Sequence, residues 1–374
     1  MPASRAIGSM NLYSTLLRPL LFRLDAETAH RLALSLGARL GFAGNALRRL
    51  TAVDDPRLAV TVAGLTFPSP VGLAAGFDKS GEAVEALAGL GFGFIEIGSV
   101  SAFPSAGNPK PRLFRLPDDR AIAVAYGVPN DGAEIVAARL VPVRLPVPLG
   151  INIVKTNFGP GAPPETDDAI VAEYMQAARV LAPRADYLMF NLSCPNTVDG
   201  RDFFAERGRL EAWLAALSDT PLPCPLFLKV SPLGGVAAIE QLLEAAAPHH
   251  CIRGFMFNLP SAKPVSAMRT PRGLWQAMPG AVSGPPSAPL LDQCLQECYR
   301  RMDRKRYVLF ASGGVSSGAE AYAKIRMGAS LVALYTALIY DGPLVARRVT
   351  QELAALLARD GFTSVADAVG VDNA

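Results

Sequence analysis

The sequence has few of the residues that several catalytic classes require. It contains three histidines, His30, His249 and His250, and none of them follows a predicted strand. This scarcity argues against Ser-His or Cys-His catalysis and against a His-rich metal site, so we expect no metal. The five cysteines include no Cys-x-x-Cys pair, and an odd number makes a poor disulfide framework. We therefore expect a reducing, cytoplasmic compartment.

Strong net charge and long apolar runs are also missing. The formal net charge is +3 without a long basic block, which argues against nucleic acid as the main partner. No uninterrupted run of about 18 apolar residues occurs, so we expect no membrane span. What the sequence does have is 374 residues, 50% of them hydrophobic, which is enough for a large core.

Apolar runs alternate with helical patterns along most of the chain. A small β-hairpin is predicted at 58–67, and eight buried strands are predicted at 71–76, 93–100, 148–154, 187–193, 225–231, 254–259, 307–314 and 331–338. Helices are predicted at 80–90, 132–140, 167–182, 207–217, 235–246, 289–303, 318–327 and 344–359. This α/β pattern is typical of a (β/α)8 TIM barrel. An open doubly wound sheet is the alternative, but it would usually show G-x-G-x-x-G after its first strand. Proline-rich stretches at 101–112, 158–165 and 260–289 are predicted to be long loops over one rim.

Two short amphipathic helices are predicted ahead of the barrel. Leucines recur at helical spacing over 10–24, with arginines between them. Asp25 is the expected N-cap of a second helix that reaches about Gly41. Basic amphipathic helices suit a membrane surface, and the alternative is a helical cap packed on the core of the fold. We predict an N-terminal helical extension at 1–45 and a barrel at 46–374.

One polar stretch follows the predicted strand over 187–190. It reads Asn191-Leu192-Ser193-Cys194-Pro195-Asn196-Thr197, and its proline cannot sit in the middle of a sheet. Two amides, a hydroxyl and a thiol are therefore expected just beyond the strand. Amides can fix a planar polar ligand, and a thiol can move a proton. The alternative is a polar turn with a small buried cysteine.

Polar residues and glycines occur near the ends of the other predicted strands as well. They are Lys79, Gly98, Ser99, Asn152, Lys155, Lys229, Asn258, Gly313, Gly314, Tyr335 and Thr336. Because active sites of (β/α)8 barrels lie at the carboxyl ends of the strands, we predict a site at that rim. Gly313 and Gly314 precede a helix start and offer backbone N–H groups to a phosphate. A phosphate-bearing organic cofactor fits this pattern best.

Several of these motifs resemble the dihydroorotate dehydrogenase family. The matching segments are AAGFDKSGE (74–82), IEIGSVSAFPSAGNPKPRLFRLP (95–117), GINI (150–153), NLSCPNT (191–197), LKVSP (228–232), SGP (283–285), SGGVSSGAEAYAKIRMGASLV (312–332) and LYTALIYDGP (334–343). They occur in order over roughly residues 10–345. The N-terminal helix pair resembles the quinone-linked, membrane-associated class 2 type.

The resemblance implies an FMN-dependent oxidoreductase of pyrimidine biosynthesis. It would oxidise dihydroorotate to orotate, pass electrons to a quinone, and sit peripherally on the cytoplasmic side of the inner membrane. The implied FMN contacts are Ala75, Gly76, Lys79, Ser99, Asn152, Asn191, Lys229, Gly284, Gly313, Gly314, Tyr335 and Thr336. The implied substrate contacts are Lys79, Asn191, Asn196 and Asn258. Cys194 would be the base, Lys229 would stabilise reduced FMN, and Arg115 matches the arginine of the quinone tunnel.

Three features depart from the family pattern. Cys194 stands where the quinone-linked class usually has Ser, although the soluble class uses Cys, and a thiol can act as a base near neutral pH. Val124 and Val128 replace an Asn that contacts substrate and a Phe near the base. Phe257 and Leu259 replace the two threonines of a Thr-Asn-Thr motif. Two alternatives therefore stay open: a flavin oxidoreductase of this family with a different ring substrate, and a non-catalytic flavoprotein at the membrane surface.

Overall fold

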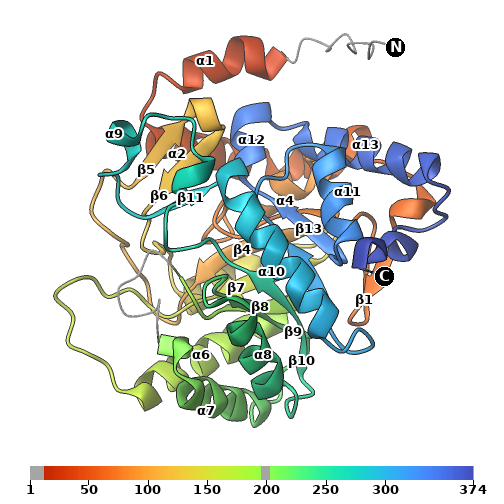
Figure 1. Ribbon diagram of the computed structural model, residues 1–374. Coiled ribbons are helices and arrows are strands. Elements are labelled where there is room, and N and C mark those ends of the chain that lie inside the picture. The colour runs from red at the N-terminus through yellow and green to blue at the C-terminus, as the bar shows by residue number, and fades with distance from the viewer. Residues whose placement is uncertain (1–11, 195–202, 374) are drawn as a thin grey trace.

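Eight parallel strands close into a barrel in the computed structural model, which describes residues 12–194 and 203–373 (Figure 1). The strands are β3 (Val71–Leu73), β4 (Ile95–Val100), β7 (Leu149–Ile153), β8 (Tyr187–Asn191), β9 (Leu226–Val230), β10 (Ile252–Phe257), β12 (Val308–Ala311) and β13 (Leu331–Leu334). Each strand hydrogen-bonds to the next in this order, and β13 pairs with β3. The predicted (β/α)8 barrel is confirmed, because an open sheet would leave two edge strands unpaired.

Helices cover the outside of the barrel, with α6, α7 and α8 along one side and α11 and α13 along another (Figure 1). They are α4 (Val84–Ala88), α5 (Ala133–Leu140), α6 (Asp167–Leu181), α7 (Arg207–Ser218), α8 (Gly235–Ala246), α10 (Ala288–Arg301), α11 (Gly318–Arg326), α12 (Thr336–Asp341) and α13 (Val345–Arg359). Side-chain caps fix where two of these helices begin. The Thr166 side chain accepts a hydrogen bond from the Ala169 amide at the start of α6, and the Ser317 side chain accepts one from the Glu320 amide at the start of α11. All eight predicted helices are present, although the one predicted at 80–90 begins only at Val84.

Aromatic side chains fill the interior of the barrel. Tyr187, Phe227 and Phe310 come from β8, β9 and β12, Phe94 directly precedes β4, and all four are fully or almost fully buried. Their ring centroids lie 4.9 to 5.9 Å apart, mostly edge to face, as packed aromatic rings prefer. The lower part of the barrel is therefore a packed core, and a ligand can be held at the mouth but not within the barrel.

A three-stranded antiparallel sheet lies outside the barrel. It consists of β5 (Leu113–Leu116), β6 (Ala121–Val124) and β11 (Ala281–Ser283), in the order β11-β6-β5. The prediction of an uninterrupted loop over 260–289 is therefore wrong at β11, and that stretch also holds α9 (Arg272–Trp275). Strands of three or four residues between prolines are too short to give a clear alternating pattern. The predicted hairpin is confirmed as β1 (Val60–Val62) and β2 (Leu65–Phe67).

The N-terminal segment is helical, as predicted, and lies at the same end of the molecule as β5 and β6 (Figure 1). Its elements are η1 (Tyr13–Leu17), α1 (Arg18–Leu21), α2 (Ala26–Leu40), η2 (Gly41–Ala43) and α3 (Gly44–Thr51), the last of which was not predicted. Asp25 caps α2 as expected, since its Oδ1 accepts from the Thr28 amide at 2.9 Å. Among the described residues, no helix combines the length and apolarity that crossing a bilayer requires.

A buried ion pair joins α2 to the residue that directly precedes β5. The Arg112 guanidinium donates to both carboxylate oxygens of Glu27, at 2.8 and 3.2 Å, and the two side chains are 9% and 10% exposed. Burial opposes ionisation of Glu27, but its bonds to Arg112 and to Lys110 outweigh burial and lower the pKa of the carboxyl. The extension is therefore docked by a charged contact that was not predicted.

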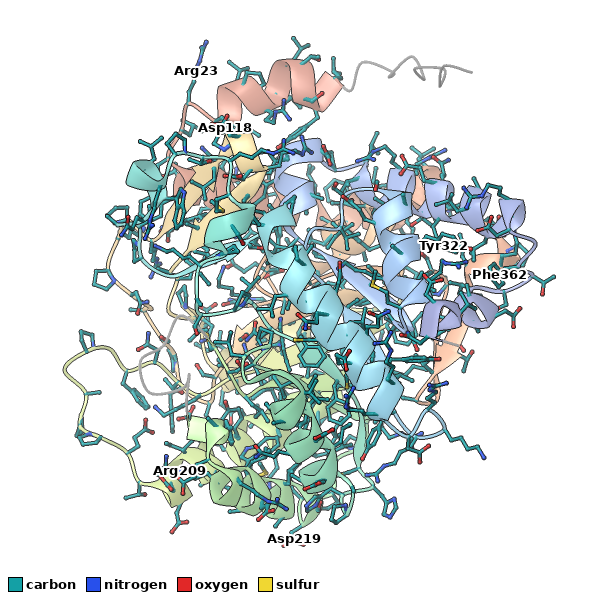
Figure 2. All side chains as sticks on the ribbon, in the orientation of Figure 1. Arg23, Asp118, Arg209, Asp219, Tyr322 and Phe362 are labelled. Carbon is teal, nitrogen blue, oxygen red and sulfur yellow. The ribbon has the colours of Figure 1, made fainter. Side chains whose placement is uncertain are left out.

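Most of the large apolar side chains that are exposed in the described structure lie between residues 12 and 50. They are Leu12, Leu16, Leu17, Leu20, Leu24, Leu32, Leu36, Leu40, Phe42, Leu47 and Leu50. Arg23 extends away from the body of the molecule, at the end opposite to Arg209 and Asp219 (Figure 2). These side chains are therefore not part of the packed core, whereas α2 also buries Ala26, Ala29 and Leu34 as a helical cap would.

Candidate active site

A cavity opens at the carboxyl ends of the barrel strands. The predicted site residues that line it are Ala75, Gly76, Lys79, Ser99, Asn191, Cys194, Lys229, Asn258, Gly284, Gly313, Gly314, Tyr335 and Thr336. Residues from β6 and β11 complete the wall. The structure therefore brings together side chains that are up to 261 residues apart in the sequence, between Ala75 and Thr336.

Three predicted site residues are not among those that line the cavity. Asn152 is buried behind Ser99, whose Oγ donates to Oδ1 of Asn152 at 2.5 Å. The guanidinium of Arg115 lies 4.6 Å from the ring centroid of Phe22, between β5 and the N-terminal helices. Asn196 lies outside the described residues.

Two amide side chains meet above β9, at the ends of β8 and β10. Asn258 Nδ2 donates to Oδ1 of Asn191 at 2.9 Å and to the carbonyl oxygen of Ser193 at 3.0 Å. Asn191 is paired with Lys229 in the β8–β9 ladder, and both residues line the cavity. These bonds fix the strand end that carries Cys194.

Cys194 faces an apolar patch of the cavity wall. It is 4% exposed and packs in a cluster with Val128 and Val154. Lys229 is close enough for its charge to interact with the thiol. The sulfur therefore lies between two apolar side chains and one cation, in a site from which bulk water is largely excluded.

A carboxylate that sequence reasoning missed lies beneath the cavity floor. Glu96 in β4 is buried, and its two oxygens accept hydrogen bonds from Asn152 Nδ2 and Tyr187 Oη, both at 3.1 Å. Burial raises the pKa of Glu96 and lowers that of Lys229, while their mutual attraction opposes both shifts. One signal was available in the sequence, because Glu96 is a single charge inside the apolar run Ile95–Val100.

Lys79 also lines the cavity, close to His30 of the N-terminal helix α2. Its ammonium donates to the Gly76 carbonyl at 2.7 Å and lies 3.8 Å from the ring centroid of Tyr126. Burial lowers the pKa of Lys79 to about 8. His30 of α2 packs 4.8 Å from the ring of Phe77, and burial, with the charge of Lys79, lowers the pKa of His30 to about 3. A neutral imidazole therefore stands behind the lysine.

The glycine-rich end of the cavity has the geometry of an anion cradle. Gly284 and Gly314 have φ of +110° and +72°, which side chains rarely adopt. A Cβ on Gly314 would lie 2.9 Å from the Cβ of Ala288 and one on Gly284 only 3.0 Å from a backbone oxygen. Glycine thus lets the backbone approach the cavity closely, and backbone N–H groups in such turns suit a phosphate.

The departures from the family pattern lie mainly on one apolar wall. Val124, Val128 and Leu259 line the cavity together with Ile122 and Met256. Phe257, in contrast, is buried and is not among the lining residues. Within the described residues, no three His, Cys, Asp or Glu side chains are grouped as metal ligands.

A closed parallel barrel with its polar and glycine residues gathered at one mouth defines an enzyme of the (β/α)8-barrel class. The family model described as dihydroorotate dehydrogenase matches residues 57–357. The chain belongs to the dihydroorotate dehydrogenase family, whose members are flavin oxidoreductases, and it is similar to the quinone-linked class 2 type.

Relatives and solved structures agree over nearly the full length. A dihydroorotate dehydrogenase (quinone) of Natronomonas pharaonis is 42% identical over 369 residues, covering 97% of this chain and 100% of the relative. One of Sphingopyxis alaskensis is 41% identical, covering 95% and 96%. The crystal structure of DHODH from Eimeria tenella in complex with ferulenol has a TM-score of 0.78 at 31% identity, covering 95% of this chain and 99% of that chain.

Proposed function

We propose that this chain oxidises dihydroorotate to orotate, with FMN as its cofactor and a quinone as the electron acceptor. The observation that carries the proposal is that Asn191, Cys194, Lys229 and Asn258 converge on one cavity whose far end is rich in glycine. Membership of the family and similarity to relatives named dihydroorotate dehydrogenase (quinone) support it. In this proposal residues 46–374 hold the cofactor and substrate, and residues 1–45 face the membrane.

The chemistry of the cavity lining suits a flavin mononucleotide. Its glycine-rich end offers close backbone approach for the phosphate, and its other end offers amides and ammonium groups for a polar ring. The proposed phosphate-side contacts are Gly284, Gly313, Gly314, Tyr335 and Thr336. The proposed ring-side contacts are Ala75, Gly76, Lys79, Ser99, Asn152, Asn191 and Lys229. When bound, the flavin accepts a hydride from the substrate and delivers the electrons to the quinone.

The side chains around the substrate position have distinct proposed roles. Cys194 Sγ removes a proton from the substrate carbon next to the carbon that loses hydride. The Lys79 ammonium pairs with the substrate carboxylate, while Asn191, Asn196 and Asn258 bond to the polar edges of the ring. Lys229 would supply a positive charge at the ring-side end of the cavity, where it would stabilise negative charge on a bound cofactor.

The exposed N-terminal leucines and Arg115 are proposed to bind and admit the quinone, which is the second substrate. Exposed leucines over 12–50 give an apolar surface that a bilayer can cover, and Arg115 lies between those helices and β5. A membrane-dissolved quinone would then reach the flavin from the side of α2. This arrangement corresponds to a peripheral enzyme on the cytoplasmic side of the inner membrane.

Anaerobic reduction of the bound flavin tests the proposal directly. The purified protein should carry FMN with its yellow spectrum, dihydroorotate should bleach that spectrum without oxygen, and a soluble quinone should restore it. Bleaching by dithionite but not by dihydroorotate would contradict the proposal. It would favour a second candidate, a family oxidoreductase with a more apolar ring substrate, which the wall of Ile122, Val124, Val128 and Leu259 supports.

A further inference from the structure

Arg120 lines the cavity at its glycine-rich end, although no motif in the sequence pointed to it. It precedes β6 and has a left-handed backbone with φ of +48°. Its carbonyl oxygen lies 3.0 Å from the position that a Cβ on Gly284 would take, and the Thr336 methyl lies 3.3 Å from the same position. The backbone of Arg120 is therefore a direct neighbour of the anion cradle.

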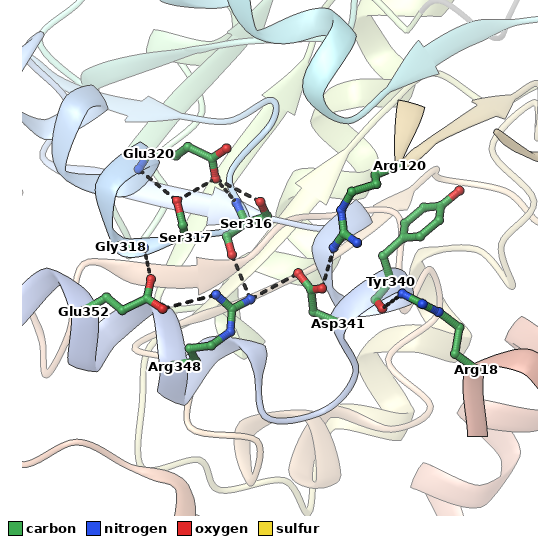
Figure 3. A network of polar contacts seen from close by, with 10 residues as sticks. All are labelled: Arg18, Arg120, Ser316, Ser317, Gly318, Glu320, Tyr340, Asp341, Arg348 and Glu352. Carbon is green, nitrogen blue, oxygen red and sulfur yellow. Dashed lines mark hydrogen bonds and ion pairs between the residues drawn. The ribbon is translucent and has the colours of Figure 1, made fainter. Parts of the chain in front are cut away.

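A shared carboxylate orients the guanidinium of Arg120. Arg120 and Arg348 both donate to Asp341, which lies between the two arginines (Figure 3). The second arginine also donates to the carbonyl oxygen of Ser316 at 2.9 Å, and Ser316 itself lines the cavity. The guanidinium of Arg120 lies over the ring of Tyr340, 5.5 Å from its centroid. These contacts hold Arg120 beside the loop that follows Gly314.

The loop that follows Gly314 already faces a negative charge, so an anionic ligand bound there requires a nearby cation. Glu320 accepts hydrogen bonds from the Ser316 amide at 2.7 Å and from the Ser317 hydroxyl at 3.0 Å, so a carboxylate already faces the loop (Figure 3). A phosphate monoester would add a charge of about −1.5 to −2 beside it. Lys79, Arg120 and Lys229 are the described cations that line the cavity. Lys79 and Lys229 are proposed ring-side contacts, whereas Arg120 adjoins Gly284 at the proposed phosphate end.

We propose that Arg120 is a further cofactor-binding residue of this chain, whose guanidinium attracts the phosphate group of the flavin. The inference rests on the proposed function, because it requires that the cofactor carries a phosphate at the glycine-rich end. The side chain of Arg120 is 43% exposed, so it can turn toward an incoming phosphate while it stays next to Asp341. Arg suits this role because its planar fork matches phosphate oxygens.

The test compares FMN with riboflavin, which has the same ring system but no phosphate. Dissociation constants for both flavins are measured on the apoprotein by flavin fluorescence, at low and high salt, for the wild type, Arg120→Gln and Arg120→Lys. Arg253→Gln is the matched control, because Arg253 is exposed in β10 and is not among the residues that line the cavity. Circular dichroism verifies folding, and loss of a partly exposed ion pair should cost little stability.

Arg120→Gln should weaken FMN binding about tenfold, which corresponds to about 1.4 kcal/mol. Its riboflavin affinity should stay within about twofold of the wild type, Arg120→Lys should recover part of the FMN affinity, and salt should weaken FMN binding less in Arg120→Gln than in the wild type. Equal weakening of both flavins, or unchanged FMN affinity, would overturn the inference. A wild-type chain that binds no FMN would instead overturn the proposed function.

Discussion

The side-chain amide of Asn258 donates a 2.9 Å hydrogen bond to Oδ1 of Asn191, and this bond joins the ends of two strands that flank β9. The same amide also donates to the carbonyl oxygen of Ser193, next to Cys194 in the chain. The pair thus fixes the geometry of the strand end on which the proposed base is carried, and the Leu259 amide, which donates to Oδ1 of Asn258 at 2.9 Å, fixes the orientation of the second amide.

Replacement of Asn258 by Asp tests this bridge. The carboxylate would face two oxygen atoms where an amide now donates, and an unpaired buried polar group costs roughly 1–3 kcal/mol. Dihydroorotate should bind about tenfold or more weakly to Asn258→Asp, as measured by perturbation of the flavin spectrum. The exposed Asn45→Asp is the control for the same chemical change and should bind as the wild type. Unchanged binding by Asn258→Asp would show that the bridge does not shape the substrate site.

Removal of the thiol of Cys194 should separate chemistry from cofactor binding. Cys194→Ala should retain FMN but slow anaerobic flavin reduction by dihydroorotate at least about 100-fold, because a positioned base contributes about 10²–10⁴. Cys194→Ser keeps an atom that can accept a proton and should be faster than Cys194→Ala. Cys251→Ala, a change at a cysteine that does not line the cavity, should reduce its flavin normally. Rapid reduction in Cys194→Ala would assign the base elsewhere.

Substrate affinity should depend on pH through Lys79. Its pKa is lowered by burial from 10.5 to about 8, so the ammonium is charged below pH 8 and loses its proton above it. Affinity for the anionic substrate should therefore be constant at lower pH and fall by up to about tenfold per pH unit above pH 8. Titrations of the wild type and Lys79→Met from pH 6 to pH 10 measure it. The methionine variant should bind weakly at every pH and without this decline.

The buried contact between Arg112 and Glu27 should stabilise the chain in a pH-dependent way. Removing one partner of a buried ion pair costs on the order of 3–5 kcal/mol, so Arg112→Met should lower the free energy of unfolding in urea at neutral pH. Because the folded-state pKa of Glu27 is lowered from 4.5, its contribution is present above that value and is lost as pH falls through the folded-state pKa. The wild type and Arg112→Met should therefore converge in stability in acid; a constant difference would contradict an electrostatic origin.

Charged residues on the exposed leucine surface should weaken membrane contact selectively. Leu16 and Leu20 are 58% and 57% exposed, so the double substitution Leu16→Glu, Leu20→Glu should leave folding and flavin reduction intact. It should reduce sedimentation with lipid vesicles and turnover with a long-chain quinone, but not with a short soluble one. Ile135→Glu, which changes an exposed side chain of α5, is the matched control. Equal loss with both quinones would contradict a role at the membrane.

The barrel could be predicted because each of its elements carries a local signal. Buried strands such as 187–191 are continuous apolar runs, and caps such as Asp25 mark where helices begin. The sheet of β5, β6 and β11 could not be predicted. Its strands are short, and β11 pairs with β6, which lies far from it in the sequence. Its position matters for function, since it completes the wall of the cavity.

The residues that line the cavity could be predicted better than the buried residues that hold them in position. Residues at strand ends, such as Lys229 and Asn258, line the cavity as the barrel architecture requires. Glu96, by contrast, lies within a strand and is bonded to Asn152, 56 positions away. The contact between Arg120 and Asp341 joins residues 221 positions apart. Such contacts follow from the tertiary fold and leave no spacing pattern in the sequence.

The wall of the cavity nearest α2 belongs to segments outside the barrel, and this has an evolutionary consequence. In the proposed function, chemistry on the ring would use groups at the strand ends, whereas access from the lipid side would be controlled by residues 12–51 and by β5 and β6. A lineage could then exchange its electron acceptor by altering these added segments while the barrel and its ring chemistry stay unchanged. The two half-reactions would be modular, because different parts of the chain would control them.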